Sequence, residues 1–125
     1  MITPKIVKKI ISLKIKYKIS IFGDMQCSSQ VGSITKFKNF SLLCPNEREA
    51  NLSLMDKESG LEALSQNLIS KTNTRRLIMK LGNDGFISYD RDKNDMIFSQ
   101  SFPSLSVNPL DVAGAGDSLM AVMAI

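Results

Sequence analysis

The sequence has no apolar run long enough to cross a membrane or to form the core of a signal peptide, because lysines interrupt every apolar stretch near its start. Its two cysteines, Cys27 and Cys44, lack C-x-x-C or zinc-ligand spacing. They are therefore interpreted as ordinary apolar residues of a reduced compartment. Internal repeats and low-complexity tracts are also missing. These absences favour a cytoplasmic globular protein without a membrane partner.

Acidic residues are absent before Asp24, and this stretch accounts for the formal charge of +4. Six lysines precede Asp24, namely Lys5, Lys8, Lys9, Lys14, Lys16 and Lys18. Apart from Tyr17, no aromatic side chain interleaves with them, so the segment lacks the stacking platform of single-stranded nucleic-acid binders. A solvated helix face is the favoured interpretation, and no nucleic-acid partner is expected.

The chain has the size of one domain, with 125 residues of which 43% are hydrophobic and 22% charged. Apolar spacing and turn residues predict alternating helices and strands. The expected order is a helix from Pro4, a strand at 18–22, a loop with a short helical turn at 24–38, a strand at 40–44, helices at 46–55 and around 61–69, and a strand at 76–81. This alternation indicates an α/β layer with a parallel sheet.

The last third of the sequence has a different pattern. Strand-like segments at 85–90 and 96–100 flank the polar cluster R-D-K-N-D and predict a β-hairpin. Further on, D-V-A-G-A-G-D-S predicts a glycine-rich turn that leads into an apolar helix. No C-cap signal precedes Ile125, so the chain is expected to end inside that helix.

The stretch 111–117 carries the strongest functional signal. Gly114 and Gly116 permit backbone angles closed to other residues, and the following helix would direct its free N–H groups at the turn. A phosphate there would be stabilised by those donors, with Asp117 beside it to accept the proton of an attacking hydroxyl. The alternative is a strand-to-helix turn with Asp117 or Ser118 as N-cap, which needs no ligand. Spacing alone leaves both open.

D-V-A-G-A-G-D-S resembles the C-terminal signature of the ribokinase or PfkB family of carbohydrate kinases, usually written D-T-x-G-A-G-D. The resemblance implies that Asp117 is the catalytic base. It also implies that the backbone of Gly114, Ala115 and Gly116 forms the anion hole. Val112 departs from the usual Thr and removes a hydroxyl near the phosphates.

Two further segments resemble motifs of the same family in the same order. Asn46-Glu47-Arg48-Glu49 is similar to its N-x-x-E motif, which implies that Asn46 and Glu49 organise magnesium and the nucleotide phosphates. The alternative for this pair is a helix capping box. The segment K-L-G-N-D-G resembles the family's strand end near ATP, which implies that Lys80, Gly82 and Gly85 bind nucleotide. Its alternative is an ordinary turn.

The resemblance implies that residues 1–125 form part of a ribokinase-like three-layer α/β fold, with a mostly parallel sheet flanked by helices and a β-hairpin. Family members are much longer. An amino-terminal part with sugar contacts and a lid, and segments after the G-A-G-D helix, are therefore expected to be missing from this sequence.

The activity implied is ATP- and Mg²⁺-dependent phosphoryl transfer to a hydroxyl of a sugar or sugar phosphate. The stretch 24–32 is similar to the heptose-7-phosphate kinase branch, the kinase half of ADP-heptose synthases, although a solvated loop is an equal alternative. A non-catalytic remnant that binds nucleotide weakly or serves as an interaction module also stays open, as does a homodimer.

Overall fold

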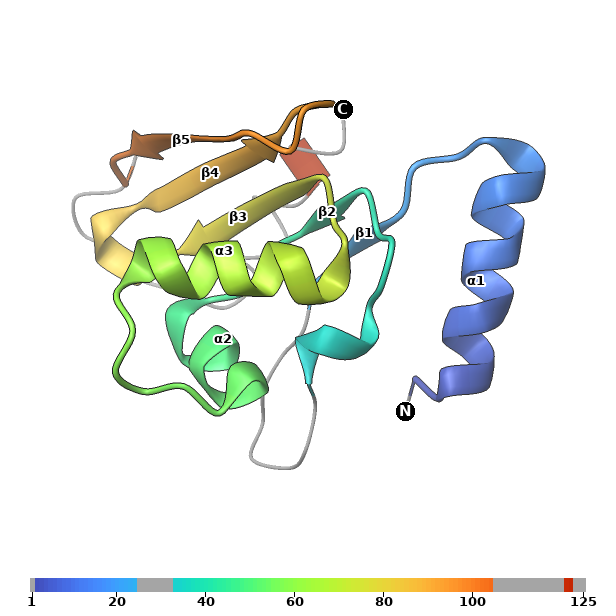
Figure 1. Cartoon of the computed structure of the whole chain (residues 1–125), viewed down its shortest axis with the longest axis horizontal. Coiled ribbons are helices and arrows are strands. Elements are labelled where there is room, and N and C mark those ends of the chain that lie inside the picture. The colour runs from blue at the N-terminus through green and yellow to red at the C-terminus, as the bar shows by residue number, and fades with distance from the viewer. Residues whose placement is uncertain (1, 25–32, 105–120, 123–125) are drawn as a thin grey trace.

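The computed structural model describes residues 2–24, 33–104 and 121–122 (Figure 1). Its helices are α1 (Pro4–Tyr17), α2 (Glu47–Leu54) and α3 (Leu61–Thr72), with 3₁₀ turns η1 (Ile34–Lys36) and η2 (Gly82–Asp84). Its strands are β1 (Phe22–Gly23), β2 (Leu42–Leu43), β3 (Arg76–Lys80), β4 (Phe86–Arg91) and β5 (Ile97–Phe102). This order confirms the predicted alternation, the short helical turn and the hairpin.

The five strands form one mixed sheet in the order β1-β2-β3-β4-β5. β1, β2 and β3 are parallel, and the hairpin adds β4 and β5 in antiparallel fashion. Parallel strands end on the same side, so β1, β2 and β3 end along one edge, which we call the carboxyl edge. β5 runs in the direction of β3 and ends there as well. The opposite side is the amino edge.

The first two strands are shorter than the predicted segments 18–22 and 40–44. Lys18 closes α1 in a left-handed conformation with φ 53°, and Asn39 turns the chain before β2 with φ 61°. Pairing therefore begins only where the carbonyl of Ile21 accepts from the backbone N–H groups of Ser41 and Leu42, at 2.8 and 3.3 Å. A strand can extend only as far as the neighbouring strand provides backbone hydrogen-bond partners.

Buried side chains lie on both faces of the sheet. α2 and α3 cover one face, where Leu64, Leu68 and Ile69 of α3 belong to the same core as the strand residues Leu77 and Met79 (Figure 1). The opposite face has its own buried cluster, formed by Leu42, Cys44 and Ile78 with Phe22 and Phe86 packed against it. Strands buried on both faces are typical of a sheet between two layers.

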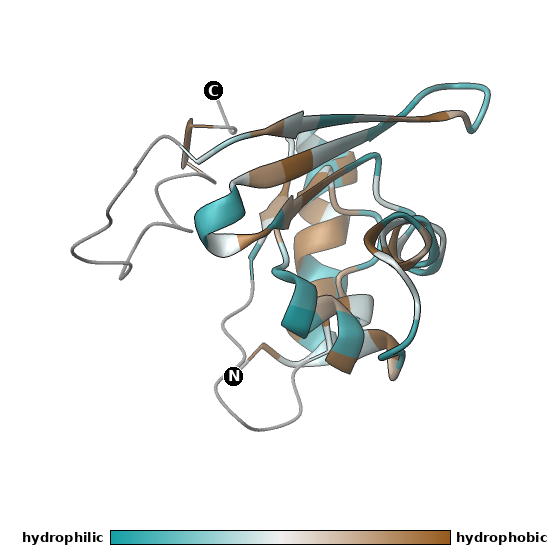
Figure 2. Ribbon diagram, turned by 90° about the vertical axis from the view of Figure 1, so that its left-hand side faces the viewer, coloured by the Kyte–Doolittle hydropathy of each residue, from teal (hydrophilic) through white to brown (hydrophobic). Residues whose placement is uncertain are grey.

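Hydropathy follows this arrangement (Figure 2). Hydrophobic segments lie in the strands and in the helices beside them, whereas the turn of the β4–β5 hairpin is hydrophilic. Across the described ranges, no helix combines the length and the apolarity needed to span a membrane.

Candidate functional site at the carboxyl edge

Polar residues follow each of the three parallel strands at the carboxyl edge. Asp24 comes directly after β1, Asn46 lies just beyond β2, and Lys80 is the last residue of β3. Asn46 and Lys80 are bridge partners in register, and the Lys80 N–H donates to the carbonyl of Pro45 at 2.9 Å. Ligands of open α/β sheets bind beyond the carboxyl ends of the strands. The structure thus brings the predicted residues Asn46 and Lys80 together at such an edge.

Asp24 is a residue of this edge that the sequence did not assign to the site. Its carboxylate accepts both contacts of the Lys80 ammonium, with Nζ 2.9 Å from Oδ1 and 3.1 Å from Oδ2. The two side chains are 12% and 19% exposed, so the pair is largely shielded from water. Because β2 lies between β1 and β3, this ion pair ties the two outer strands of the parallel part together. In the sequence, the position of Asp24 just after a predicted strand was the signal that could have placed it at this edge.

Asn46 and Glu49 form the capping box that the sequence offered as an alternative. The Glu49 N–H donates to Asn46 Oδ1 and the Asn46 N–H donates to Glu49 Oε2, both at 2.8 Å. Glu49 is only 4% exposed. Among the described residues, no group of three or more acidic, cysteine or histidine side chains is placed to hold a metal ion. A role of this pair with Mg²⁺ stays a prediction, and it would suit an ion that keeps most of its waters.

The two glycines of the β3–β4 connection differ in their surroundings. Gly82 has φ +60°, and a Cβ built on it would meet nothing within 4 Å. Gly85 has φ +93°, and its Cβ would lie 2.0 Å from the Phe102 carbonyl oxygen. Gly82 therefore leaves open space where a ligand could approach the backbone, whereas Gly85 is required for packing against the end of β5.

Cys44 lies in the core directly beside this edge. Burial raises the pKa of its thiol to about 12, the nearby Asp24 carboxylate adds to the rise, and Lys80 opposes it. The thiol therefore stays protonated at neutral pH and is poorly suited to act as a nucleophile. Cys44 is a free, buried cysteine, which confirms its interpretation as an apolar residue. Cys27 lies outside the described residues.

The residues of the G-A-G-D motif, Gly114, Ala115, Gly116 and Asp117, lie outside the described part of the chain, as do Val112 and residues 25–32. The described chain passes the end of β5 and reaches Ser104, next to Gly85 at the carboxyl edge. Ala121 and Val122, in the stretch predicted to be an apolar helix, are helical.

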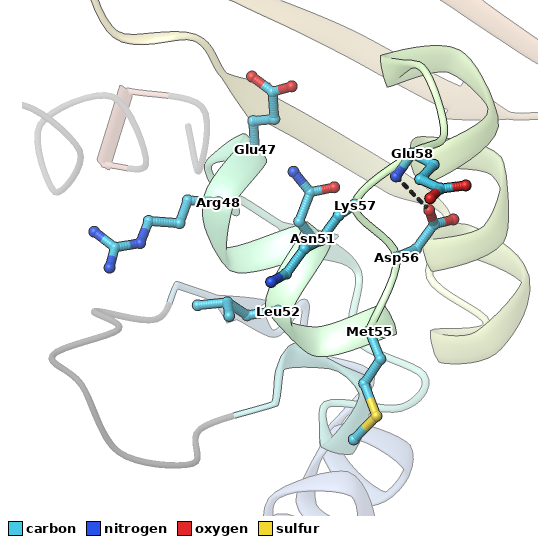
Figure 3. Close-up of a pocket in the computed structure, with 8 residues that line it drawn as sticks. All are labelled: Glu47, Arg48, Asn51, Leu52, Met55, Asp56, Lys57 and Glu58. Atoms are coloured by element: carbon cyan, nitrogen blue, oxygen red, sulfur yellow. Dashed lines mark hydrogen bonds between the residues drawn. The ribbon is translucent and has the colours of Figure 1, made fainter.

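An open groove of about 1140 Å³ runs along α2 and the turn that follows it (Figure 3). It is lined by Glu47, Arg48, Asn51, Leu52, Met55, Asp56, Lys57 and Glu58. The Ser59 side chain, followed by the N–H groups of Ser59 and Glu58, lowers the pKa of Asp56. The hydrogen bonds from the two N–H groups to Asp56 also fix the turn. None of the predicted site residues lines this groove, and its charges are mixed. The carboxyl edge is therefore the stronger candidate.

Solved structures similar to this chain include phosphofructokinase-2 and ribokinase. The chain matches phosphofructokinase-2 from Escherichia coli, in complex with substrates and products, with a TM-score of 0.76 and 18% identity, over 98% of this chain and 39% of that one. It matches ribokinase from Thermotoga maritima with a TM-score of 0.64 and 17% identity, over 89% and 36%. At these identities the matches establish the ribokinase-like fold over part of its length.

Curated relatives include the bifunctional protein HldE of Campylobacter concisus, which is 31% identical over 126 residues, covering 98% of this chain and 24% of the relative. HldE of Campylobacter jejuni (strain RM1221) is 28% identical over 130 residues, covering 98% and 25%. The chain thus spans about a quarter of the length of these relatives. The model of the pfkB family carbohydrate kinases matches residues 20–125. The chain belongs to the pfkB family of carbohydrate kinases.

Proposed function

We propose that this chain carries the phosphoryl-transfer edge of an ATP- and Mg²⁺-dependent kinase that acts on a hydroxyl of a sugar or sugar phosphate. The observation that carries the proposal is the family match over residues 20–125, which includes the G-A-G-D motif. The carboxyl edge supports it, since Asn46, Lys80 and the open backbone at Gly82 lie there.

In this proposal Asp117 accepts the proton of the substrate hydroxyl. The hydroxyl oxygen bonds to the γ-phosphorus of ATP, and the bond between that phosphorus and the departing ADP oxygen breaks. The backbone N–H groups of Gly114, Ala115 and Gly116 stabilise the charge on the transferred group. Asn46 and Glu49 would hold hydrated Mg²⁺, which neutralises phosphate charge when bound. Positioning and charge neutralisation supply most of the catalysis, so the base need not be strong.

The proposed acceptor is heptose 7-phosphate. The support is the similarity of the chain to HldE proteins together with the likeness of residues 24–32 to the heptose-7-phosphate kinase branch. We place the reaction in the cytoplasm, where ATP and Mg²⁺ are supplied.

Asp117→Asn should abolish ADP production by the purified chain while ATP binding is retained. Losing a positioned general base costs about 10²–10⁴-fold in rate, whereas the amide has nearly the same shape as the carboxylate. The measurement is coupled detection of ADP with ATP, Mg²⁺ and a sugar panel that includes heptose 7-phosphate, with calorimetric titration of ATP alongside. Equal loss of turnover and ATP binding would contradict the assigned role. Absence of wild-type turnover with every sugar would contradict an autonomous kinase.

Glu49→Gln separates the capping role of Glu49 from a role with Mg²⁺. Gln completes a capping box as Glu does, so the free energy of unfolding should stay within about 0.5 kcal/mol of wild type. The negative charge is lost, and the Mg²⁺ concentration needed for half-maximal ATP binding should rise about tenfold. Calorimetric ATP titrations at a series of Mg²⁺ concentrations measure this directly. An unchanged Mg²⁺ dependence would assign Glu49 to the cap alone.

The alternative function, an interaction module that forms a homodimer, is favoured by the surface of α1. Val7, Ile10 and Ile11 pack on the core, but a second apolar stripe on the same helix is exposed. We call it the α1 stripe; it consists of Ile6, Leu13 and Tyr17 of the helix, with Ile2 just before it. The helix stands at the outside of the molecule beside β1 (Figure 1). Lys16 lies over the Tyr17 ring at one end of this stripe, with Nζ 5.1 Å from the ring centroid, so a symmetric contact between two copies would form mainly around Ile6 and Leu13.

Under this alternative, the chain is expected to be a dimer that Ile6→Lys/Leu13→Lys converts to a monomer. Both side chains are 37% or more exposed, so the substitutions should not disturb the fold. Light scattering coupled to size-exclusion chromatography measures the mass. Ile15→Lys is the matched control, because Ile15 is 74% exposed and lies on another side of α1. A wild-type chain that is monomeric at high concentration would rule out this contact.

A further inference from the structure

We propose that the amino edge of the sheet holds a binding site for a small organic phosphate. The site, which we call the arginine pocket, is a cavity of about 540 Å³. Its walls come from α1, the segments leading into β1, β2 and β3, and the end of β4. Its polar lining includes Lys14, Asn39, Asn73, Arg75, Arg76 and Arg91.

The lining is strongly basic. It includes one lysine and three arginines, and none of its residues within the described part of the chain is acidic. Asp90, which contacts Arg75 and Arg76 from the neighbouring strand β4, offsets one of these charges. Asp95 approaches Arg91 at 3.7 Å, but its side chain is 85% exposed and its charge is therefore screened by water. The pocket keeps a positive excess that suits an anion.

Arg75 and Arg76 line this pocket with side chains that are 70% and 57% exposed, so their guanidinium groups are open to a ligand and have donors to spare. Arg76 Nε lies 2.8 Å from Asp90 Oδ2, and Arg75 Nε lies 3.5 Å from Asp90 Oδ1. Both arginines thus use Nε toward one carboxylate, and their terminal nitrogens have no acceptor among the residues that the structure describes. Paired guanidinium forks match the oxygens of a phosphate, which can accept two parallel hydrogen bonds from each.

The remaining polar wall is already assembled. The Lys14 ammonium donates to the Asn39 carbonyl at 2.5 Å, and the Asn73 side-chain amide donates to Asn39 Oδ1 at 2.7 Å. Arg91 Nη2 in turn donates to Asn73 Oδ1 at 2.7 Å. These contacts hold long side chains in place before any ligand arrives, which reduces the entropy lost on binding.

Phe22 and Leu42 give the same pocket an apolar part, which would contact the organic portion of the ligand. The pocket is separate from the proposed catalytic edge. Arg76 and Lys80 lie at opposite ends of β3, roughly 13 Å apart along the strand. A phosphate bound here would therefore be distinct from the one transferred at the carboxyl edge.

Calorimetric titration of the full chain with phenyl phosphate, and with inorganic phosphate at equal ionic strength, tests the proposal. Phenyl phosphate should bind more tightly than inorganic phosphate, and Arg75→Gln/Arg76→Gln should weaken it about tenfold or more. Lys5→Gln/Lys8→Gln removes the same charge from the exposed side of α1 and should leave the affinity unchanged.

Equal weakening by the two double variants, or no binding of phenyl phosphate, would overturn the proposal. Affinity equal to that of inorganic phosphate would do the same. A single-stranded oligonucleotide that outcompetes phenyl phosphate would reassign the surface to nucleic acid. Because Arg76 also holds Asp90, Arg75→Lys/Arg76→Lys provides a variant that keeps the charge but loses the forks, and it should weaken binding to an intermediate degree. On the wild-type chain, phenyl phosphate should shift the NMR amide signals of Asn39 and Asn73.

Discussion

Gly85→Ala is expected to destabilise the chain by about 3 kcal/mol or more, which is a large part of the stability of a small domain. The conformation at Gly85, φ +93° and ψ −131°, is nearly closed to residues with a side chain. In addition, the new methyl group would lie 2.0 Å from the Phe102 carbonyl oxygen and 2.6 Å from the carbonyl carbon of Pro103. Both neighbours are backbone atoms, so the end of β5 would have to move.

Chemical denaturation followed by circular dichroism measures this effect, and Gly82→Ala is the matched control. Gly82 has φ +60° but open space around its Cβ position, so its substitution should cost only about 1–2 kcal/mol of backbone strain. If Gly85→Ala lowered the free energy of unfolding no more than Gly82→Ala does, the end of β5 would not lie as close to Gly85 as described. The comparison also decides how the K-L-G-N-D-G segment should be understood, with Gly85 serving the fold and Gly82 leaving room for a ligand.

Local signals in the sequence were sufficient for most of the fold. The spacing of apolar residues placed α1 and α3, because a helix that packs on one side repeats its apolar positions every three to four residues. Asn46 and Glu49 marked the start of α2, and the capping box that was the alternative interpretation of this pair is present. The polar cluster R-D-K-N-D placed the hairpin turn. Each of these features depends on residues within a few positions of one another.

Features that depend on strand order could not be predicted in the same way. Asp24 and Lys80 are 56 residues apart and meet only because β1 and β3 flank β2 in parallel. The arginine pocket gathers residues from several segments that adjoin the sheet at its amino edge. The short extents of β1 and β2 likewise follow from where neighbouring chains begin to pair. The roles of Gly114, Ala115, Gly116 and Asp117 rest on the sequence motif alone.

Breaking the ion pair between Asp24 and Lys80 is the second substitution expected to have a large effect. Removing one partner of a buried pair costs about 3–5 kcal/mol, and with a fifth of the Lys80 side chain exposed we expect roughly 2 kcal/mol for Lys80→Met. Asp95→Asn serves as the control, since its pair with Arg91 is 3.7 Å long and open to water and should contribute less than about 1 kcal/mol.

A double-mutant cycle isolates the interaction itself. Lys80→Met, Asp24→Asn and the combined variant are unfolded in urea, and the combined loss should be clearly smaller than the sum of the single losses because the second substitution removes an already broken contact. Additive losses would show that the contact between the two side chains contributes little. The cycle therefore tests whether β1 and β3 are held together across β2 at the carboxyl edge.

The same variants reveal whether Lys80 also binds the phosphates of a nucleotide. If its ammonium contacts phosphates, Lys80→Met should weaken ATP binding while Asp24→Asn, which releases the ammonium from its carboxylate partner, should preserve or strengthen it. If the ion pair only stabilises the carboxyl edge, both substitutions should weaken ATP binding to a similar extent. Each would loosen the strand ends that position Asn46 and Gly82. Opposite signs in the two titrations would make Lys80 a binding residue, and equal losses would make it a positioning residue of the fold.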